Sequence, residues 1–70
     1  MFSAANLVRI RKERGFSQEE VARRSGLATG TISKLEERKN TDPKMRTVRK
    51  LAQALDCPLE AFFSEELRDL

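Results

Sequence analysis

The sequence predicts a compact all-α domain of five short helices. Apolar residues recur every three or four positions along most of the 70 residues, as they do on the buried face of a helix. Alternation with a period of two is absent and β-branched residues never cluster, so no strand is expected. Because no repeat, linker or low-complexity segment interrupts the pattern, residues 1–70 are expected to form one domain.

The first helix is expected to begin after Ser3, whose hydroxyl can cap it. Leu7 and Ile10 are spaced to lie on one stripe of this helix. Gly15 is expected to end it, because glycine tolerates the left-handed conformation at a helix C-terminus. Phe16 then anchors the connection to the core.

The second helix opens with a serine followed three residues later by a glutamate. Ser17 and Glu20 have this spacing, which is typical of a capping box. Val21 and Ala22 are expected on the inner side of the helix. The segment Ser-Gly-Leu at 25–27 is expected to end it.

A third helix is expected to begin near Ala28 or Thr29 and to bury Ile32 and Leu35. Residues 37–44 are polar and contain Asn, Asp and Pro, which predicts the one long loop.

The last two helices follow this loop. A fourth is predicted by apolar residues at intervals of three and four, namely Met45, Val48, Leu51, Ala52 and Leu55. Asp56 and Cys57 interrupt the pattern, and Pro58 suits the first turn of a fifth helix. The apolar contacts of that helix are expected from Leu59, Phe62, Phe63 and Leu67.

The composition excludes most catalytic and metal sites. The chain has no His and a single cysteine, Cys57, so it cannot form an internal disulfide or complete a zinc site. Without His there is no Ser–His or Cys–His nucleophile and no general base near neutral pH. A chain this short also has little room for a walled pocket. We therefore expect no enzyme, no cofactor and no small-molecule ligand, and Cys57 is expected to be a small apolar filler.

No stretch approaches the ~20 apolar residues that span a bilayer. The N-terminal region also lacks the uncharged stretch of a secretory signal. Together with the free cysteine, these features predict a cytoplasmic protein without a membrane partner.

The net charge of +3 is unevenly distributed along the chain. Residues 58–70 contain four acidic side chains and one basic side chain, a balance of −3. The remaining 13 basic and 7 acidic side chains give residues 1–57 a balance of +6. A basic body of this kind favours binding to nucleic acid.

Residues 18–37 have the layout of a helix-turn-helix, two short helices joined by a tight turn that contains glycine. Ala22 is small enough to let the two helices cross closely, and Gly26 allows the sharp turn. The side chains expected to point outward from the second of these helices are Thr29, Gly30, Ser33 and Lys34. Such a surface can enter a DNA major groove about 12 Å wide and approach the base edges.

The sequence resembles the phage Cro/C1-type helix-turn-helix domains of the XRE family. The resemblance rests on LVRIRKERGFSQEEVARRSGLATGTISKLEERK, followed by P-x-x-x-x-V-x-x-L-A-x-A-L, and covers about residues 5–63. It implies a lambda-repressor-like fold and a sequence-specific transcriptional regulator that binds double-stranded DNA. A domain of this size resembles restriction–modification controller proteins and small phage or plasmid repressors, and some antitoxins are similar.

The resemblance also implies roles for individual residues. Arg11 and Glu36 fall on a salt bridge of the family, and Gln18 on a glutamine that binds a DNA phosphate and braces the recognition helix. The residues that match base-reading positions are Thr29, Gly30, Ser33 and Lys34. Those expected at phosphates are Gln18, Ser17, Thr31, Arg23, Lys39, Asn40, Thr41, Lys44 and Arg46. The sequence departs from the family at Arg38, where many members have glycine, and at Gly30, which supplies no side-chain donor.

Residues 58–70 are expected to form a C-terminal dimerisation helix, since they carry more apolar surface than a last element needs. The interface is expected to consist of Leu59, Phe62, Phe63 and Leu67; the alternative is that these side chains fold inward. A homodimer with recognition helices one turn of DNA apart would read a palindromic operator and either block or contact RNA polymerase. A second class of function is a protein-interaction module, or an antitoxin-like partner, on the same scaffold.

Overall fold

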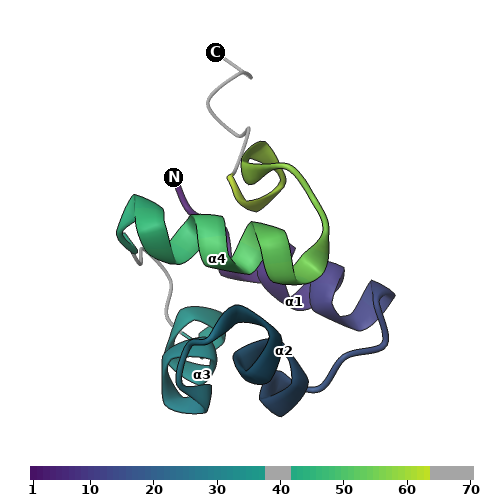
Figure 1. Ribbon diagram of the computed structural model, residues 1–70. Helices are drawn as coiled ribbons and strands as arrows, with labels where there is room; N and C mark the ends of the chain where they lie inside the picture. The colour runs from purple at the N-terminus through teal and green to yellow at the C-terminus, as the bar shows by residue number, and fades with distance from the viewer. Residues whose placement is uncertain (38–41, 64–70) are drawn as a thin grey trace.

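The computed structural model describes residues 1–37 and 42–63. These two ranges contain four α-helices and one short 3-10 helix (Figure 1). Their bounds are α1 (Ala4–Glu13), α2 (Gln18–Ser25), α3 (Thr29–Glu37), α4 (Met45–Leu55) and η1 (Leu59–Phe62). The predicted all-α fold is confirmed, and none of the helices in the described ranges is long and apolar enough to cross a membrane.

The fifth element differs from the prediction. Instead of an α-helix after Pro58, the structure has the four-residue 3-10 helix η1. Phe63 is already extended, with φ −111° and ψ 141°, and pairs with Phe2 in an isolated antiparallel bridge. This pairing with the N-terminal segment ends the helical conformation at Phe62, which a local sequence pattern cannot anticipate.

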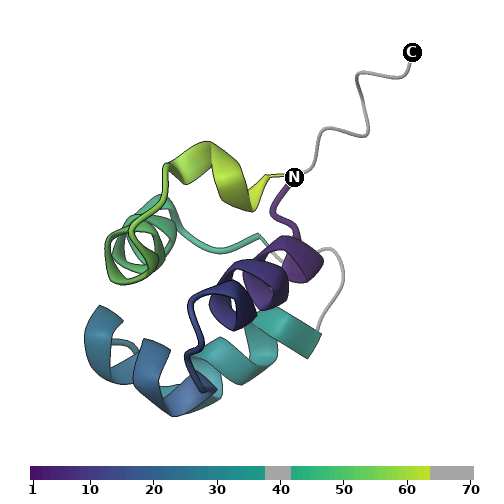
Figure 2. The same cartoon turned by 90° about the vertical axis from the view of Figure 1, so that its right-hand side faces the viewer.

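The helices form two layers. Viewed from the side, α4 and α1 lie on opposite sides of the molecule, with α2 and α3 beneath them (Figure 2). Helix α2 packs against both α3 and α4, whereas α1 packs against α3 and η1. The helix-turn-helix therefore forms one end of the domain, supported by the other helices.

The helix ends are fixed by local chemistry that the sequence predicts. The Ser3 hydroxyl accepts a hydrogen bond from the Asn6 amide at 3.1 Å, and the Ser17 hydroxyl accepts one from the Glu20 amide at 3.0 Å. Gly26 has a φ of 78° and donates its amide to the carbonyl of Ala22 at the end of α2. A left-handed glycine at this position satisfies a terminal carbonyl at little steric cost.

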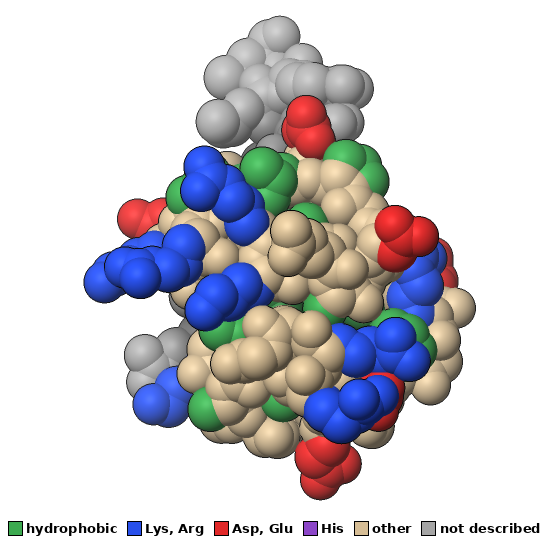
Figure 3. All heavy atoms as spheres, viewed as in Figure 1, with side chains coloured by type: hydrophobic (Ala, Val, Ile, Leu, Met, Phe, Trp, Pro, Cys, Tyr) green, Lys and Arg blue, Asp and Glu red, His purple; other side chains and the backbone are tan. Residues whose placement is uncertain are grey.

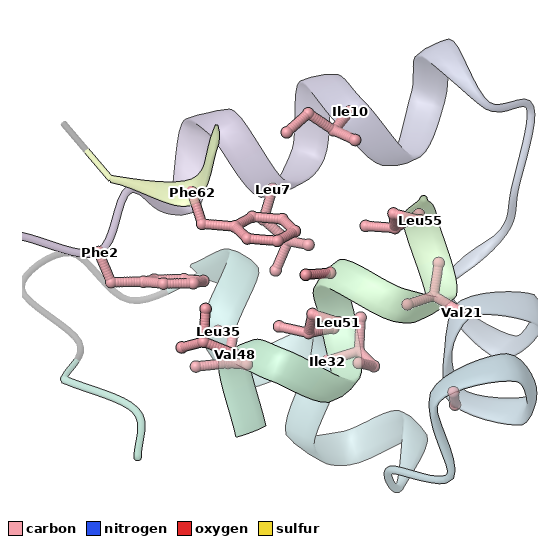
Figure 4. Close-up of a cluster of buried hydrophobic side chains, with 12 residues drawn as sticks. Phe2, Leu7, Ile10, Val21, Ile32, Leu35, Val48, Leu51, Leu55 and Phe62 are labelled. Carbon is pink, nitrogen blue, oxygen red and sulfur yellow. The ribbon is translucent and has the colours of Figure 1, made fainter. Parts of the chain in front are cut away.

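The core is a single cluster of buried side chains drawn from every element (Figure 4). Its members are Phe2, Leu7, Ile10, Val21, Ala22, Ile32, Leu35, Val48, Leu51, Ala52, Leu55 and Phe62. The ring of Phe62 is fully buried and stacks on Phe2 with a centroid distance of 6.0 Å. Met45 was predicted on the apolar stripe of the fourth helix, but it is 47% exposed at the first residue of α4. The buried stripe begins one turn later, at Val48.

Two sets of long-range hydrogen bonds tie α1 to the C-terminal part of the fold. Asn6 donates its side-chain amide to the carbonyl of Ala61 at 3.1 Å. Arg14 donates from Nε to the carbonyl of Leu55 at 2.7 Å and from Nη2 to that of Asp56 at 3.2 Å. The guanidinium thus binds carbonyls at the C-terminus of α4, where the helix dipole also favours positive charge.

Two glycine substitutions should have opposite effects on stability. Gly26→Ala should destabilise the domain by about 1 kcal/mol or more, because alanine rarely adopts a φ of 78°. Gly30→Ala should stabilise it by about 0.5–1 kcal/mol, because Gly30 lies in α3 with open space around its Cβ position. Urea unfolding of both variants provides the test, and equal effects of the same sign would contradict this account of the turn.

Candidate nucleic-acid interface

Helix α3 presents a small, polar outer surface. Ile32 and Leu35 are buried against the domain, while Thr29, Gly30 and Lys34 are exposed and Ser33 is half-buried. Apart from its chain neighbours and the backbone of α3 itself, no atom lies within 4 Å of the position a Cβ would take at Gly30, so the backbone there is open to a close approach. These are the four residues expected to read bases, and the structure brings them onto one face of α3.

A surface hollow of about 380 Å³ lies between α3 and the start of α4. Its lining consists of Thr31, Lys34, Leu35, Asp42, Pro43, Lys44 and Thr47. DNA contacts were expected from three of these residues, Thr31, Lys34 and Lys44. They line the same hollow although the first two belong to α3 and Lys44 directly precedes α4. Thr47 also lines the hollow but was not among the residues expected there, because its position beside α3 depends on how α4 packs.

The carboxylate of Glu36 holds three parts of the fold together. It accepts hydrogen bonds from Arg11 Nε at 2.6 Å and from Arg11 Nη2 at 3.0 Å, and one from Gln18 Nε2 at 2.9 Å. Arg11 also donates from Nη1 to the carbonyl of Phe16 at 2.9 Å. The Arg11 and Glu36 side chains are only 12% and 6% exposed. This bidentate, nearly buried pair fixes the end of α3 against α1 and the start of α2.

The contact with Glu36 also determines how the Gln18 amide is oriented. A carboxylate only accepts hydrogen bonds, so the amide nitrogen must face it. One of the two N–H groups of Gln18 is used in this way, and the other can serve a second acceptor. The resemblance implies that Gln18 binds a phosphate and braces the recognition helix. Its bond to Glu36 joins it to α3, and the phosphate contact remains a prediction.

The arginines of α2 are already engaged within the helix. The Glu20 carboxylate pairs with Arg23 and accepts a hydrogen bond from Arg24 Nε at 2.6 Å. The guanidinium of Arg24 also lies 4.3 Å from the centre of the Phe16 ring. The hydrogen bonds from Arg23 and then Arg24 hold the pKa of Glu20 below its ordinary value of 4.5. Part of the positive charge expected at DNA on this helix is therefore locally compensated.

Basic side chains gather over the N-terminal half of α4 (Figure 3). Lys44 and Arg46 are both exposed there.

Ser17 caps α2 at the exposed start of the helix-turn-helix. The other expected phosphate ligands, Lys39, Asn40 and Thr41, lie outside the described residues.

The structure describes three of the four residues expected at a dimer interface. Phe62 is fully buried in the core of the domain, so its assignment to an interface is corrected. Leu59 and Phe63 are half-buried against the core, and Leu67 lies outside the described residues. Cys57 is also half-buried, and burial raises the pKa of its thiol, in keeping with a packing role.

Comparisons with known proteins agree with this geometry. Residues 7–62 match the helix-turn-helix family. The restriction–modification controller protein C.AhdI from Aeromonas hydrophila superposes with a TM-score of 0.78 and 32% identity, covering 86% of this chain and 89% of that one. The N-terminal DNA-binding domain of the biofilm regulator SinR from Bacillus subtilis gives a TM-score of 0.79 and 26% identity, covering 91% and 93%.

A curated relative matches a shorter stretch of the chain. The uncharacterised transcriptional regulator y4dJ from Sinorhizobium fredii is 45% identical over 51 residues, which are 73% of this chain and 65% of that protein. The chain therefore spans somewhat less than two thirds of the length of this relative.

Replacing Glu36 by methionine should leave most of the protein molecules unfolded. Removal of one partner leaves Arg11 as an uncompensated, nearly buried charge, which costs about 3–5 kcal/mol and is close to the whole stability of a domain this small. The double variant Arg11→Met/Glu36→Met should be more stable than Glu36→Met alone, because no charge is left buried. Circular dichroism and urea unfolding test both variants, and a double variant less stable than the single one would contradict the argument.

The ion pairs of Glu20 should make stability depend on pH. Folding lowers the pKa of Glu20, so its ion pairs contribute to the free energy of unfolding. This contribution is complete at a pH above the pKa of the unfolded state, near 4.5, and is lost as the pH falls through the pKa of the folded state. Glu20→Gln should therefore lower the Tm at neutral pH and have no effect in strong acid. Glu19→Gln is the matched control, because Glu19 occupies the same first turn and makes no ion pair with any described residue. Equal effects of the two variants at neutral pH would contradict the role of Glu20.

Proposed function

Because the chain belongs to the helix-turn-helix family of the phage Cro/C1 (XRE) type, we propose that it is a sequence-specific regulator of transcription that binds double-stranded DNA. The observation that carries this proposal is the outer face of α3. Small and polar side chains cover it, and Gly30 leaves its backbone accessible, so the helix can lie deep in a major groove. In this arrangement α3 is the recognition helix.

The chemistry of this face suggests how bases are read. Lys34 can donate to the acceptors of guanine, and the hydroxyls of Thr29 and Ser33 can donate or accept at either base pair. Gly30 provides no donor but permits the closest approach of the backbone. Base reading then depends on few side chains, and a large part of the affinity comes from phosphates.

The phosphate contacts would flank this helix. Gln18 has one N–H group left after its bond to Glu36, which places a fixed donor at the start of α2. Lys34 and Lys44 border the hollow beside Thr31. They outnumber its one carboxylate, Asp42, so a phosphate would meet net positive charge and a hydroxyl donor there. Arg46 extends this basic surface onto α4. The remaining proposed ligands are Ser17, Arg23, Lys39, Asn40 and Thr41.

We propose that the protein acts as a homodimer on a palindromic operator, since two-fold symmetric proteins match two-fold symmetric sites. The likeness to C.AhdI over most of both chains supports a role as a restriction–modification controller. Occupation of the operator would then block RNA polymerase or contact it.

Binding to duplex DNA should weaken steeply with salt. Each phosphate neutralised contributes about 0.9 to the slope of log affinity against log salt. Sites selected from a random duplex pool provide the specific sequence, and fluorescence anisotropy at several salt concentrations provides the slope. A parent protein without salt-dependent affinity for any duplex would overturn the proposed function and leave a protein-interaction module as the better description.

Two variants should separate base reading from phosphate binding. Lys34→Ala should reduce the preference for the selected site, by about 1–3 kcal/mol if it reads a base. Lys44→Ala should weaken binding to all sequences alike and lower the salt slope by about 0.9. Lys12→Ala removes the same charge from the exposed surface of α1 and should leave the preference unchanged. If Lys12→Ala reduced the preference as much as Lys34→Ala, α3 would not be the reading surface.

A further inference from the structure

The hydroxyl of Ser33 is bonded to a carboxylate on the outer face of α3. Ser33 Oγ donates a hydrogen bond to Oε2 of Glu37 at 3.4 Å. The two residues are four positions apart, so their side chains lie on the same face of the helix, one turn from each other. A serine within a helix commonly donates back to a carbonyl of the preceding turn, as Ser25 does to Ala22 at 3.3 Å. Ser33 instead donates forward, toward the end of α3.

This bond determines what the Ser33 hydroxyl can offer to a second partner. A hydroxyl has one proton and two lone pairs, whereas an ionised carboxylate can only accept. The proton of Ser33 is therefore used in the bond to Glu37, and the lone pairs remain. A group that approaches Ser33 from outside meets a hydrogen-bond acceptor.

Few groups in a DNA major groove can donate to such an acceptor. Adenine presents the N6 amino group and cytosine the N4 amino group, whereas the O6 of guanine and the O4 of thymine are acceptors. An acceptor placed against Ser33 would need the proton that Glu37 holds, and it would also face the negative charge of that carboxylate. Ser33 bonded in this way suits an amino group of a base and disfavours a carbonyl.

Lys34 has the opposite hydrogen-bonding character. Its ammonium group only donates, and it makes no ion pair with Glu37 or with any other residue of the described ranges. It is exposed and can therefore meet the N7 and O6 acceptors of guanine. Consecutive residues of α3 thus require different base edges, so a shift of the helix along the groove would leave both contacts unmade.

We propose that Glu37 is a specificity-determining residue that acts through Ser33, by committing its hydroxyl to accept from the amino group of adenine or cytosine. The inference rests on the proposed function and deepens it by naming the chemical group that Ser33 recognises. Glu37 is in this sense a positioning residue, because its effect on base choice requires the Ser33 hydroxyl. Without this carboxylate, the hydroxyl could donate or accept.

Duplexes altered at a single base pair test which way the Ser33 bond runs. The preferred site is first selected from a random duplex pool, and the contacted pair is the one at which Ser33→Ala loses discrimination. An analogue without the amino group, 2-aminopurine for adenine or pyrimidin-2-one for cytosine, is then placed at this pair. The parent should bind this duplex about two- to tenfold more weakly, the range of one net hydrogen bond. Ser33→Ala should lose nothing from the same replacement.

Inversion of that base pair tests the role of Glu37. Exchanging the two bases between the strands puts a carbonyl where the amino group was, so the parent should lose affinity by at least the same factor. Glu37→Gln should tolerate the inversion, because an amide can donate to the Ser33 hydroxyl and release its proton. The double variant Ser33→Ala/Glu37→Gln should discriminate like Ser33→Ala alone, since residues that act through one contact are not additive. Fluorescence anisotropy gives each affinity, and circular dichroism shows that each variant is folded.

Glu60→Gln is the matched control, because it removes the same charge from an exposed residue of η1 and should keep the parent's penalty for inversion. The proposal is overturned if removal of the amino group weakens the parent and Ser33→Ala alike. It is also overturned if Glu37→Gln keeps the full penalty, or if Glu37→Gln changes discrimination when Ser33 is absent. In each of these cases the parent still selects a site, so the proposed function stands. A parent that selects no sequence overturns both.

Discussion

The carboxylate of Glu36 is the contact on which the arrangement of the helix-turn-helix depends. It is almost completely buried and accepts three hydrogen bonds, two from Arg11 and one from Gln18. A buried charge without such partners would cost several kcal/mol, so α1 and the start of α2 must meet the end of α3 at this point. The outer face of α3 is positioned as a consequence, because the helix is fixed at the end opposite its exposed threonine and glycine.

The rest of the domain is stabilised without a disulfide. One apolar cluster receives side chains from every element, and serine caps and left-handed glycines complete the ends of α1 and α2. Phe2 contributes to this cluster by stacking on Phe62, and the bridge between Phe2 and Phe63 closes the N-terminal segment over η1. A core built in this way includes both ends of the described chain.

The charges of the chain are divided between internal use and open surface. Arg11 and Arg14 bind groups of the fold itself, and Arg23 and Arg24 share the Glu20 carboxylate. Lys34, Lys44 and Arg46, by contrast, lie exposed beside the α3 hollow and on α4 and make no ion pair with any other described residue, so they suit phosphates. A count of basic residues cannot separate these groups, because pairing depends on neighbours that are distant in sequence.

The sequence by itself determined what depends on neighbouring residues: the helical period, the caps at Ser3 and Ser17, the turn at Gly26 and the four outward positions of α3. These features follow from interactions within about four residues, which a sequence displays directly. Only the tertiary structure decided that Phe2 joins the core, that η1 stops at Phe62, and that Gln18 is held by Glu36. Each of these depends on how α4 and the N-terminal segment pack, and packing is decided by contacts between residues far apart in the chain.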